Sequence, residues 1–297
     1  MTCNVAFIGL GVMGYPMAGY ISKGGHNVTV FNRTKSKAEK WIKDYKGKMA
    51  ETPAEAAKDA EFIFTCVGND NDLREVTFGD NGVFKTIKEG SVYIDNTTAS
   101  ATIAREIYDY AKKNNFGALD APVSGGEPGA IEGTLAIMTG GSSSDFERSK
   151  PVFDVLGGSS VLCGEVGAGN FTKLANQMIV GANIHILAEA LTLTTKAGLD
   201  PETVFNAIKG GLAGSNVMNT KAPMMYERNF KPGFRIELHL KDITNAMETA
   251  NEMQIPLQVT SNLHQVLKSL VLDGKGVDDN SGILKFVEKQ SGVEVKK

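Results

Sequence analysis

The sequence predicts an α/β domain with a mostly parallel, doubly wound sheet, followed by an all-α domain built around one long helix. In residues 1–164, short apolar strand-like runs alternate with helix-like stretches, a pattern typical of a parallel sheet covered on both faces. After about residue 164 this alternation stops, and a long stretch rich in Ala, Leu, Ile and Met follows without a proline. We therefore expect one domain over residues 1–164 and a second over 165–297.

The elements of the first domain follow from these runs. Strands are expected at Asn4–Gly9, Asn27–Phe31, Phe62–Val67, Val92–Asp95 and Ala118–Leu119, and Leu135–Thr139 and Ser160–Leu162 have a similar composition. Helices are expected between them, at Met13–Lys23, Lys35–Asp44, Pro53–Lys58 and Ala101–Lys113.

The second domain is expected to be helical throughout. Its longest segment, Asn170–Lys196, would extend about 40 Å at ~1.5 Å per residue, long enough to form the axis of a domain. At Asp200-Pro201 the aspartate can cap a helix and the proline can occupy its first turn. Further helices are expected at Pro201–Lys209, Leu240–Glu252 and Leu257–Leu272.

Composition excludes several classes of function. The 297 residues are 42% hydrophobic and 22% charged, with a net charge of -3 that gives no reason to expect nucleic acid or an anionic membrane as a partner. We expect neither a secretion signal nor an uninterrupted apolar run of the ~18 residues typical of a membrane span. Three cysteines and four histidines are scattered, so no disulfide framework and no metal site are predicted. We expect a cytoplasmic protein.

A glycine-rich turn is the strongest local signal. Gly9-Leu10-Gly11-Val12-Met13-Gly14 follows a predicted strand and opens a predicted helix, the context that a dinucleotide-binding turn requires. Glycines there allow a tight turn and a close approach of the backbone to a pyrophosphate, which then meets the N–H groups of the helix. The turn predicts that the first domain binds a dinucleotide, and an incidental tight turn is the alternative.

The residues at the end of the second strand should determine the preference for NAD or NADP. An NAD site usually has a carboxylate there for the ribose hydroxyls, but this chain reads Asn32-Arg33-Thr34. Arg33 can pair with a 2′-phosphate and Thr34 can donate a hydrogen bond to it. We expect a preference for NADP(H), with NAD(H) as a possible second cofactor. The alternative is that Arg33 is a solvated surface residue.

The segment Asp120–Gly126 is a candidate substrate site. It follows a predicted strand, and open α/β sheets bind ligands at the carboxyl ends of their strands. Ser124 offers a hydroxyl, and Gly125 and Gly126 can present bare backbone N–H groups to a carboxylate. A purely structural turn is the alternative.

The start of the long helix carries the candidate catalytic lysine. Lys173 lies in its first turns, and Asn176 and Gln177 follow at i+3 and i+4, so all three project from one helical face. A cation near a helix N-terminus gains nothing from the helix dipole, so this placement indicates a role other than capping. Taken without context, Lys173 could also be a solvated surface lysine.

Together these segments resemble a known family. Gly9–Gly14, Asp120–Gly126 and Gly167–Gln177 are similar to the three signature segments of the β-hydroxyacid dehydrogenases, the family that includes 3-hydroxyisobutyrate dehydrogenase, in the same order and with similar separations. The likeness continues through Gly210–Ser215 and Asn229–Arg235 and spans almost the whole chain.

The resemblance implies roles for individual residues. Lys173 would be the catalytic acid/base, with Asn176 and Gln177 orienting the reacting groups, and Ser124, Gly125 and Gly126 would hold the substrate. Thr98 would lie beside both the substrate and the cofactor. The cofactor would also contact Val67 and Lys241, in addition to Gly9, Leu10, Gly11, Val12, Met13, Gly14, Asn32, Arg33 and Thr34.

The resulting hypothesis is an oxidoreductase that reduces a small semialdehyde carboxylate, such as tartronate semialdehyde, to its hydroxyacid by hydride transfer. Lys173 would give the developing alkoxide a proton and a positive neighbour. Within the family, oxidation of 3-hydroxyisobutyrate or reduction of glyoxylate or succinic semialdehyde would use the same residues. A 6-phosphogluconate dehydrogenase is not expected, because that branch is longer and has His where Asn176 stands. A non-catalytic cofactor-binding module is the alternative from another class. The resemblance implies a homodimer or homotetramer.

Overall fold

The computed structural model describes residues 2–297, and the chain divides into two compact units, one ending at Lys173 and one running from Leu174 to Lys297. The boundary predicted from the sequence, between residues 164 and 165, lies on the N-terminal side of this division, and the long helix α8 (Ala168–Lys196) contributes to both units.

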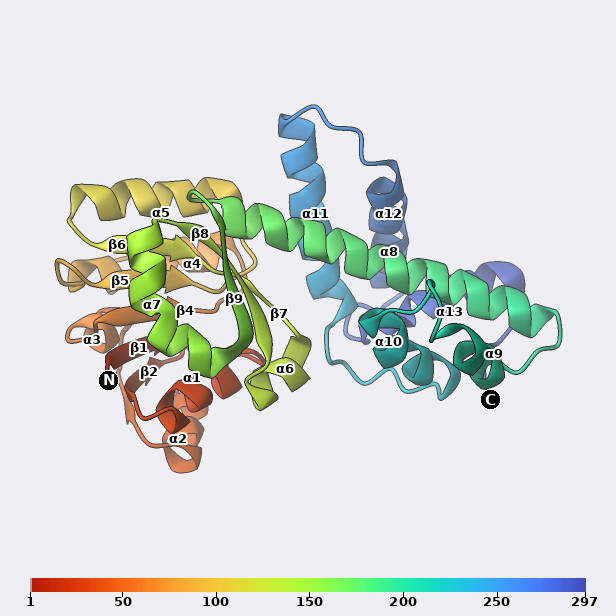
Figure 1. Ribbon diagram of the computed structural model, residues 1–297, viewed down its shortest axis with the longest axis horizontal. Coiled ribbons are helices and arrows are strands. Elements are labelled where there is room, and N and C mark those ends of the chain that lie inside the picture. Colours follow the sequence, from red (N-terminus) through yellow and green to blue (C-terminus); the bar gives the residue numbers. More distant parts are fainter. Residues whose placement is uncertain (1) are drawn as a thin grey trace. The chain divides into compact units, whose positions relative to one another are not determined.

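Within the described residues, nine strands form one sheet in the first unit, in the order β3-β2-β1-β4-β5-β6-β8-β7, with β9 paired to β8 (Figure 1). Strands β1 to β6 pair in parallel, β8 is antiparallel to both β6 and β7, and β9 returns parallel to β8. The mostly parallel sheet predicted from the sequence is therefore confirmed. The strands are β1 (Asn4–Ile8), β2 (Asn27–Phe31), β3 (Lys48–Met49), β4 (Phe62–Thr65), β5 (Val92–Asp95), β6 (Gly117–Asp120), β7 (Val123–Ser124), β8 (Leu135–Gly141) and β9 (Gly157–Gly164).

Helices cover both faces of this sheet, because alternate residues of each buried strand point to opposite sides. In β1, Val5 and Phe7 join an apolar core with α1, α2, α6 and α7, whereas Ala6 and Ile8 join a second core with α3, α4 and α5 (Figure 1). These helices are α1 (Gly14–Lys23), α2 (Lys35–Asp44), α3 (Pro53–Ala57), α4 (Asp70–Phe78), α5 (Ala101–Lys113), α6 (Gly126–Glu132) and α7 (Ser143–Leu156), with a short 3-10 turn η1 (Val83–Lys85).

The second unit is helical, as predicted. The N-terminus of α9 confirms the expected cap: Asp200 accepts a hydrogen bond from the Thr203 N–H at 2.7 Å, and Pro201 occupies the first turn. Its core packs Ile184, Leu187 and Leu191 of α8 against the remaining helices. These are α9 (Pro201–Ile208), α10 (Asn216–Tyr226), α11 (Ile236–Glu252), α12 (Gln258–Leu272) and α13 (Ile283–Ser291), with the 3-10 turn η2 (Asn280–Gly282).

Helix α8 is, among the described residues, long and apolar enough to cross a membrane by length and composition, with 33% of its most apolar window buried. That test alone is weak evidence, because central helices of helical domains pass it as well. One side of α8 carries core residues of the second unit, and its N-terminal turns carry Lys173, Asn176 and Gln177. The buried part of its apolar composition is therefore explained by the core of the second unit.

Candidate active site

The glycine turn has the geometry that a dinucleotide requires. Gly9, directly after β1, has φ +101°, and a Cβ there would collide with the Cys66 carbonyl oxygen. A Cβ on Gly14, the first residue of α1, would collide with the Gly9 carbonyl oxygen. Both glycines are therefore explained by the fold, since they let the chain turn sharply and let α1 begin close to the sheet.

Gly11 is different, because the fold does not require it. Its φ lies outside the left-handed region, and a Cβ there would meet nothing within 4 Å. A glycine at such an exposed position leaves room for a ligand to approach the backbone closely. The turn thus fits a dinucleotide, whose pyrophosphate would be held by the N–H groups around Gly11 and the N-terminus of α1.

We expect Gly11→Ala to keep the fold and weaken the cofactor. Its thermal midpoint should stay within a few degrees of wild type, because the new methyl group meets no neighbour. The Kd for NADPH should rise at least about tenfold, because the methyl group would occupy the approach to the pyrophosphate. Fluorescence titration of NADPH checks this, with Gly158→Ala in the exposed strand β9 as the control. An unchanged Kd would contradict the assignment.

Asn32 holds this turn from the neighbouring strand. Its Oδ1 accepts a hydrogen bond from the Leu10 N–H at 2.8 Å, while its Nδ2 donates to the Thr34 carbonyl oxygen at 3.0 Å. A side-chain amide can serve both partners at once because it carries a donor and an acceptor. Asn32, predicted as a cofactor residue, is therefore placed where it shapes the glycine turn.

Two cations, Arg33 and Lys35, follow Asn32 at the start of α2, and each forms an ion pair with an acidic residue. The Arg33 side chain is 79% exposed and forms an ion pair with Asp72, with 3.3 Å between Nη1 and Oδ1. Thr34 is the N-cap residue of α2, and its side chain makes no capping hydrogen bond. The first turn of α2 holds no acidic residue and begins with Lys35. Cations beside the positive end of a helix dipole favour an anionic ligand such as a phosphate.

The ends of β4 and β5 are linked through threonines. The Val67 N–H donates to Thr97 Oγ1 at 3.0 Å, and the Thr97 N–H donates to Asp95 Oδ1 at 2.9 Å. Thr98, the predicted shared residue of substrate and cofactor, follows directly and is half-buried. The predicted residues Val67 and Thr98 therefore lie on loops that begin at neighbouring parallel strands.

The candidate substrate loop leaves the sheet at the end of β6. The Ala121 N–H donates to the Asp95 carbonyl oxygen at 2.7 Å, and Asn96 Nδ2 donates to the Ala121 carbonyl oxygen at 2.6 Å. Ser124 ends the short strand β7 and is half-buried. Gly125 and Gly126 have φ +142° and +64°, so glycine is required there by the backbone. The loop is anchored at its base and presents backbone N–H groups near its end.

Lys173 lies in α8 and is only 6% exposed. Lysine is almost never buried to this extent unless its charge is paired or used. Lys173 belongs to the first unit, which also contains the glycine turn, Thr98 and the Ser124–Gly126 loop. The burial argues against the alternative of a solvated surface lysine.

The two amides that follow on α8 are held in place within the second unit. Asn176 Nδ2 donates to Gln177 Oε1 at 2.8 Å, and Gln177 Nε2 donates to Asp242 Oδ2 at 2.7 Å. Asp242 also pairs with Lys241, whose Nζ lies 3.2 Å from Oδ1. Gln177 thus connects α8 with the segment of α11 that carries Lys241, the predicted cofactor residue.

Several residues of this network were not predicted. His239 Nε2 lies 3.1 Å from the Gln177 carbonyl oxygen, and Asn280 Nδ2 lies 3.1 Å from His239 Nδ1. Because that amide nitrogen can only donate, Nδ1 accepts and Nε2 carries the proton. Asp242 could have been suspected from its place beside Lys241, but no sequence spacing connects His239 with Asn280. Within residues 2–297, no group of three or more His, Cys, Asp or Glu is arranged to hold a metal ion.

Comparison with known proteins agrees with these features. The family model described as the NAD binding domain of 6-phosphogluconate dehydrogenase matches residues 4–167. A second model, described as "NAD-binding of NADP-dependent 3-hydroxyisobutyrate dehydrogenase", matches residues 167–287.

Relatives match along nearly the whole chain. The 2-hydroxy-3-oxopropionate reductase of Escherichia coli is 36% identical over 285 residues, covering 96% of this chain and 97% of the relative. A probable mitochondrial 3-hydroxyisobutyrate dehydrogenase of Dictyostelium discoideum is 36% identical over 294 residues, covering 96% and 91%. The solved structure of Mycobacterium tuberculosis 3-hydroxyisobutyrate dehydrogenase with L-serine has a TM-score of 0.88 at 29% identity, covering 96% of this chain and 99% of that one.

Proposed function

The chain belongs to the β-hydroxyacid dehydrogenase family of NAD(P)-dependent oxidoreductases, and we propose that within it the protein reduces a small semialdehyde carboxylate with NADPH. The proposed substrate is tartronate semialdehyde, that is 2-hydroxy-3-oxopropionate, or an acid of similar size. The observation that carries the proposal is the burial of Lys173 in the same compact unit as the glycine turn and the Ser124–Gly126 loop. This burial favours an enzyme over a non-catalytic cofactor-binding module.

The reaction assigns one step to each group. When bound, the nicotinamide supplies a hydride to the aldehyde carbon. As the carbonyl double bond becomes a single bond, negative charge grows on its oxygen, and Lys173 gives that oxygen a proton. Until the proton moves, the ammonium charge stabilises the developing alkoxide. Ser124 and the N–H groups of Gly125 and Gly126 hold the carboxylate, and Asn176 and Gln177 orient the reacting groups.

Three observations support this substrate class. The loop that carries Ser124 is short and glycine-rich, which suits a small carboxylate. The E. coli relative is named for reduction of 2-hydroxy-3-oxopropionate. The mycobacterial neighbour was solved with L-serine, a three-carbon β-hydroxy acid of the size of the proposed product.

The experiment that tests this function is the initial rate of NADPH and NADH consumption with four substrates. These are tartronate semialdehyde, methylmalonate semialdehyde, succinic semialdehyde and glyoxylate. We expect the fastest turnover with tartronate semialdehyde and NADPH. Faster turnover of methylmalonate semialdehyde would instead identify a 3-hydroxyisobutyrate dehydrogenase. Tight NADPH binding without turnover of any substrate would overturn the proposed reaction and leave the fold unaffected.

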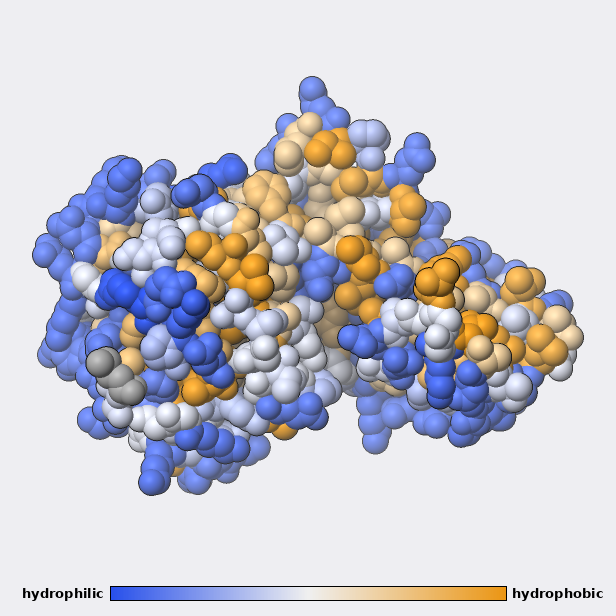
Figure 2. Space-filling view, viewed as in Figure 1, coloured by the Kyte–Doolittle hydropathy of each residue, from blue (hydrophilic) through white to orange (hydrophobic). Residues whose placement is uncertain are grey.

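We also propose that the chain forms a homo-oligomer through the exposed side of α8. Ile179, Ile186 and Leu193 are 62%, 60% and 72% exposed and recur every seven residues, so they lie along one side of the helix. Figure 2 shows apolar side chains on the helical unit along the path that α8 takes in Figure 1. Such a stripe is typical of a surface covered by another chain.

Ile186→Glu is expected to reduce the mass of the particle measured by light scattering after size exclusion, because a charge would be buried in the contact. Val161→Glu, at an exposed apolar position of β9, is the matched control and should keep the mass of wild type. A wild-type protein that is already monomeric, or an unchanged mass of the Ile186 variant, would contradict the proposed contact.

A further inference from the structure

The carboxylate of Asp120 caps the helix that carries the catalytic lysine. Helix α8 has no acidic residue in its first turn, and its first N–H groups need acceptors from elsewhere. The Gly167 N–H donates to Asp120 Oδ1 at 2.7 Å, and the Asn170 N–H donates to Oδ2 at 2.8 Å. Asp120 is buried, so these charge-assisted bonds are shielded from water.

Glycines allow the start of α8 to come this close. A Cβ on Gly140 of β8 would lie 2.5 Å from Asp120 Oδ1 and 2.8 Å from the Ala168 nitrogen. A Cβ on Gly169 would collide with the Asp120 carbonyl oxygen and lie 2.5 Å from the Met138 carbonyl oxygen. The N-terminus of α8 therefore rests directly on the backbones of β6 and β8.

The same aspartate is the last residue of β6, immediately before the substrate loop. Ser124 follows four residues later, and the loop between them is fixed by the Asn96 bond to Ala121 and by the Met138 N–H, which donates to the Pro122 carbonyl oxygen at 3.0 Å. On the other side, Lys173 lies one helical turn beyond Asn170. One side chain thus joins the base of the substrate loop to the helix turn that precedes the lysine.

We propose that Asp120 is a positioning residue, whose ionised carboxylate fixes the first turn of α8, and with it Lys173, relative to the loop that carries Ser124. This inference rests on the proposed function, since it assigns Lys173 the proton transfer. Misplacement of a reacting group by about 1 Å can lower the rate roughly 100-fold, so such a clamp has a measurable effect on turnover.

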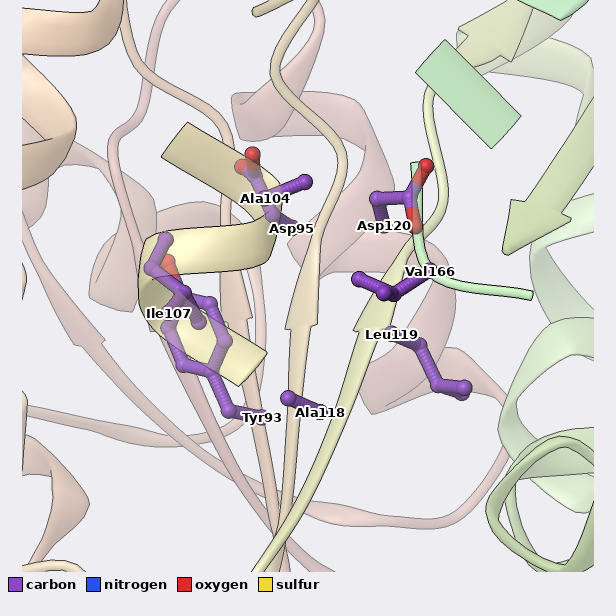
Figure 3. A pocket seen from close by; sticks show the side chains of 8 residues that line it. All are labelled: Tyr93, Asp95, Ala104, Ile107, Ala118, Leu119, Asp120 and Val166. Carbon is purple, nitrogen blue, oxygen red and sulfur yellow. The ribbon is translucent and has the colours of Figure 1, made fainter. Parts of the chain in front are cut away.

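The clamp is sensitive to pH because Asp120 is a buried acid that lies beside a second one, Asp95. Asp95 and Asp120 are register partners on the neighbouring strands β5 and β6, and both line one small cavity (Figure 3). Tyr93 is the third titratable group there, and the Thr65 hydroxyl bonds both its hydroxyl and the Asp95 carboxyl. The remaining lining residues are uncharged, namely Ala104 and Ile107 of α5, Ala118 and Leu119 of β6, and Val166.

Burial raises the pKa of Asp95 to about 7 and that of Asp120 to about 6, and the charge of Asp120 adds to the first of these shifts. Near pH 7 Asp95 is therefore about half protonated, and Asp120 is mostly ionised. As the pH falls through 6, Asp120 takes up a proton as well. A protonated carboxyl no longer offers two charged acceptor oxygens to the helix, so the clamp weakens.

The effect on stability has the opposite sign. Both pKa values lie above those of the unfolded chain, near ~4. The contribution of these two groups to folding stability is therefore fully present at low pH and is lost as the pH rises through about 6 to 7. Between pH 7.5 and 5.5, turnover should fall while these two groups make the fold no less stable.

The test compares wild type with Asp120→Asn, using semialdehyde turnover, NADPH titration and amide hydrogen exchange. In the variant, kcat at pH 7.5 should fall roughly 10- to 100-fold, with a much smaller change in the Kd for NADPH. The decline of wild-type kcat below about pH 6 should disappear, because the titrating group is gone. The amides of residues 167–170 should exchange faster in the variant than in wild type. In wild type they should exchange faster at pH 5.5 than at pH 7.5, once the intrinsic effect of pH on exchange is corrected for.

The control is Ser142→Ala, which removes the capping bond of α7 to the Asp145 N–H in the same unit. It should lower the thermal midpoint without changing the pH profile of kcat. Unchanged exchange at residues 167–170 in Asp120→Asn would overturn the clamp, even in a protein that reduces none of the semialdehydes tested. If exchange is faster in Asp120→Asn but kcat and its decline below about pH 6 match those of wild type, the proposed effect of Asp120 on Lys173 is overturned. Failure of the proposed function alone would instead appear as an inactive wild type with the exchange difference intact.

Discussion

Replacing Lys173 with methionine is expected to lower kcat for semialdehyde reduction by roughly 10²- to 10⁴-fold, the range of a lost general acid. Methionine is unbranched and nearly as long as lysine, but it has neither a proton to give nor a charge. The thermal midpoint is measured alongside kcat, because the side chain is buried and its replacement could disturb the fold. Loss of activity without loss of stability would separate a catalytic role from a structural one.

Lys173→Arg is the companion variant. Arginine keeps the positive charge but does not release its proton at accessible pH. Activity should therefore remain far below wild type, and both variants should bind NADPH with nearly wild-type affinity. In wild type, reduction needs the ammonium and alcohol oxidation needs the neutral amine, so reduction should peak at lower pH. Substantial turnover by Lys173→Met, or identical pH optima in both directions, would reject the assignment.

Arg33→Ala is expected to raise KM for NADPH roughly 10- to 100-fold while changing KM for NADH little. A hydrogen bond to a charged group contributes about 1.5–3 kcal/mol, and only NADPH has the phosphate that would receive it. Arg33 is exposed and paired with Asp72, so the substitution should not disturb the fold. Steady-state kinetics with both cofactors at fixed semialdehyde checks this.

Asp72 offers a test in the opposite direction. Its carboxylate holds Arg33 and would repel a nearby phosphate, so Asp72→Asn should lower KM for NADPH several-fold and leave KM for NADH unchanged. Asp59→Asn, which breaks an exposed ion pair with Lys88 in the same unit, is the control and should change neither. Equal effects of Arg33→Ala on both cofactors would contradict a phosphate-binding role.

The sheet and its cofactor turn could be predicted because their signals are local. The apolar run Phe62–Val67 contains the strand that it predicts, and Gly9 and Gly14 lie in the tight turn that they predict. Helices α4, α6, α7, α10 and α13 were not predicted, and a proline inside the helix accounts for two of them. Pro151 lies within α7 and Pro223 within α10, and proline normally ends a helix. Pro151 is exposed, so the carbonyl that loses its N–H partner can be satisfied by water.

The candidate site could be predicted only in part. Lys173, Ser124 and Gly11 lie in recognisable segments, but what holds them in place comes from distant parts of the chain. The contact of Asp120 with Asn170 joins residues separated by 50 positions, and that of Gln177 with Asp242 joins residues separated by 65. Such pairs leave no periodic pattern in a single sequence, because the two partners meet only in the folded chain.

The most direct test of the central claim is the fate of a deuterium label. The protein is incubated with tartronate semialdehyde and NADPH deuterated at either face of nicotinamide C4, and the hydroxyacid product is analysed by mass spectrometry and NMR. Direct hydride transfer predicts one deuteron on the new carbinol carbon from one of the two labelled cofactors and none from the other. Product without deuterium from either cofactor, or no hydroxyacid at all, would contradict the proposed reaction.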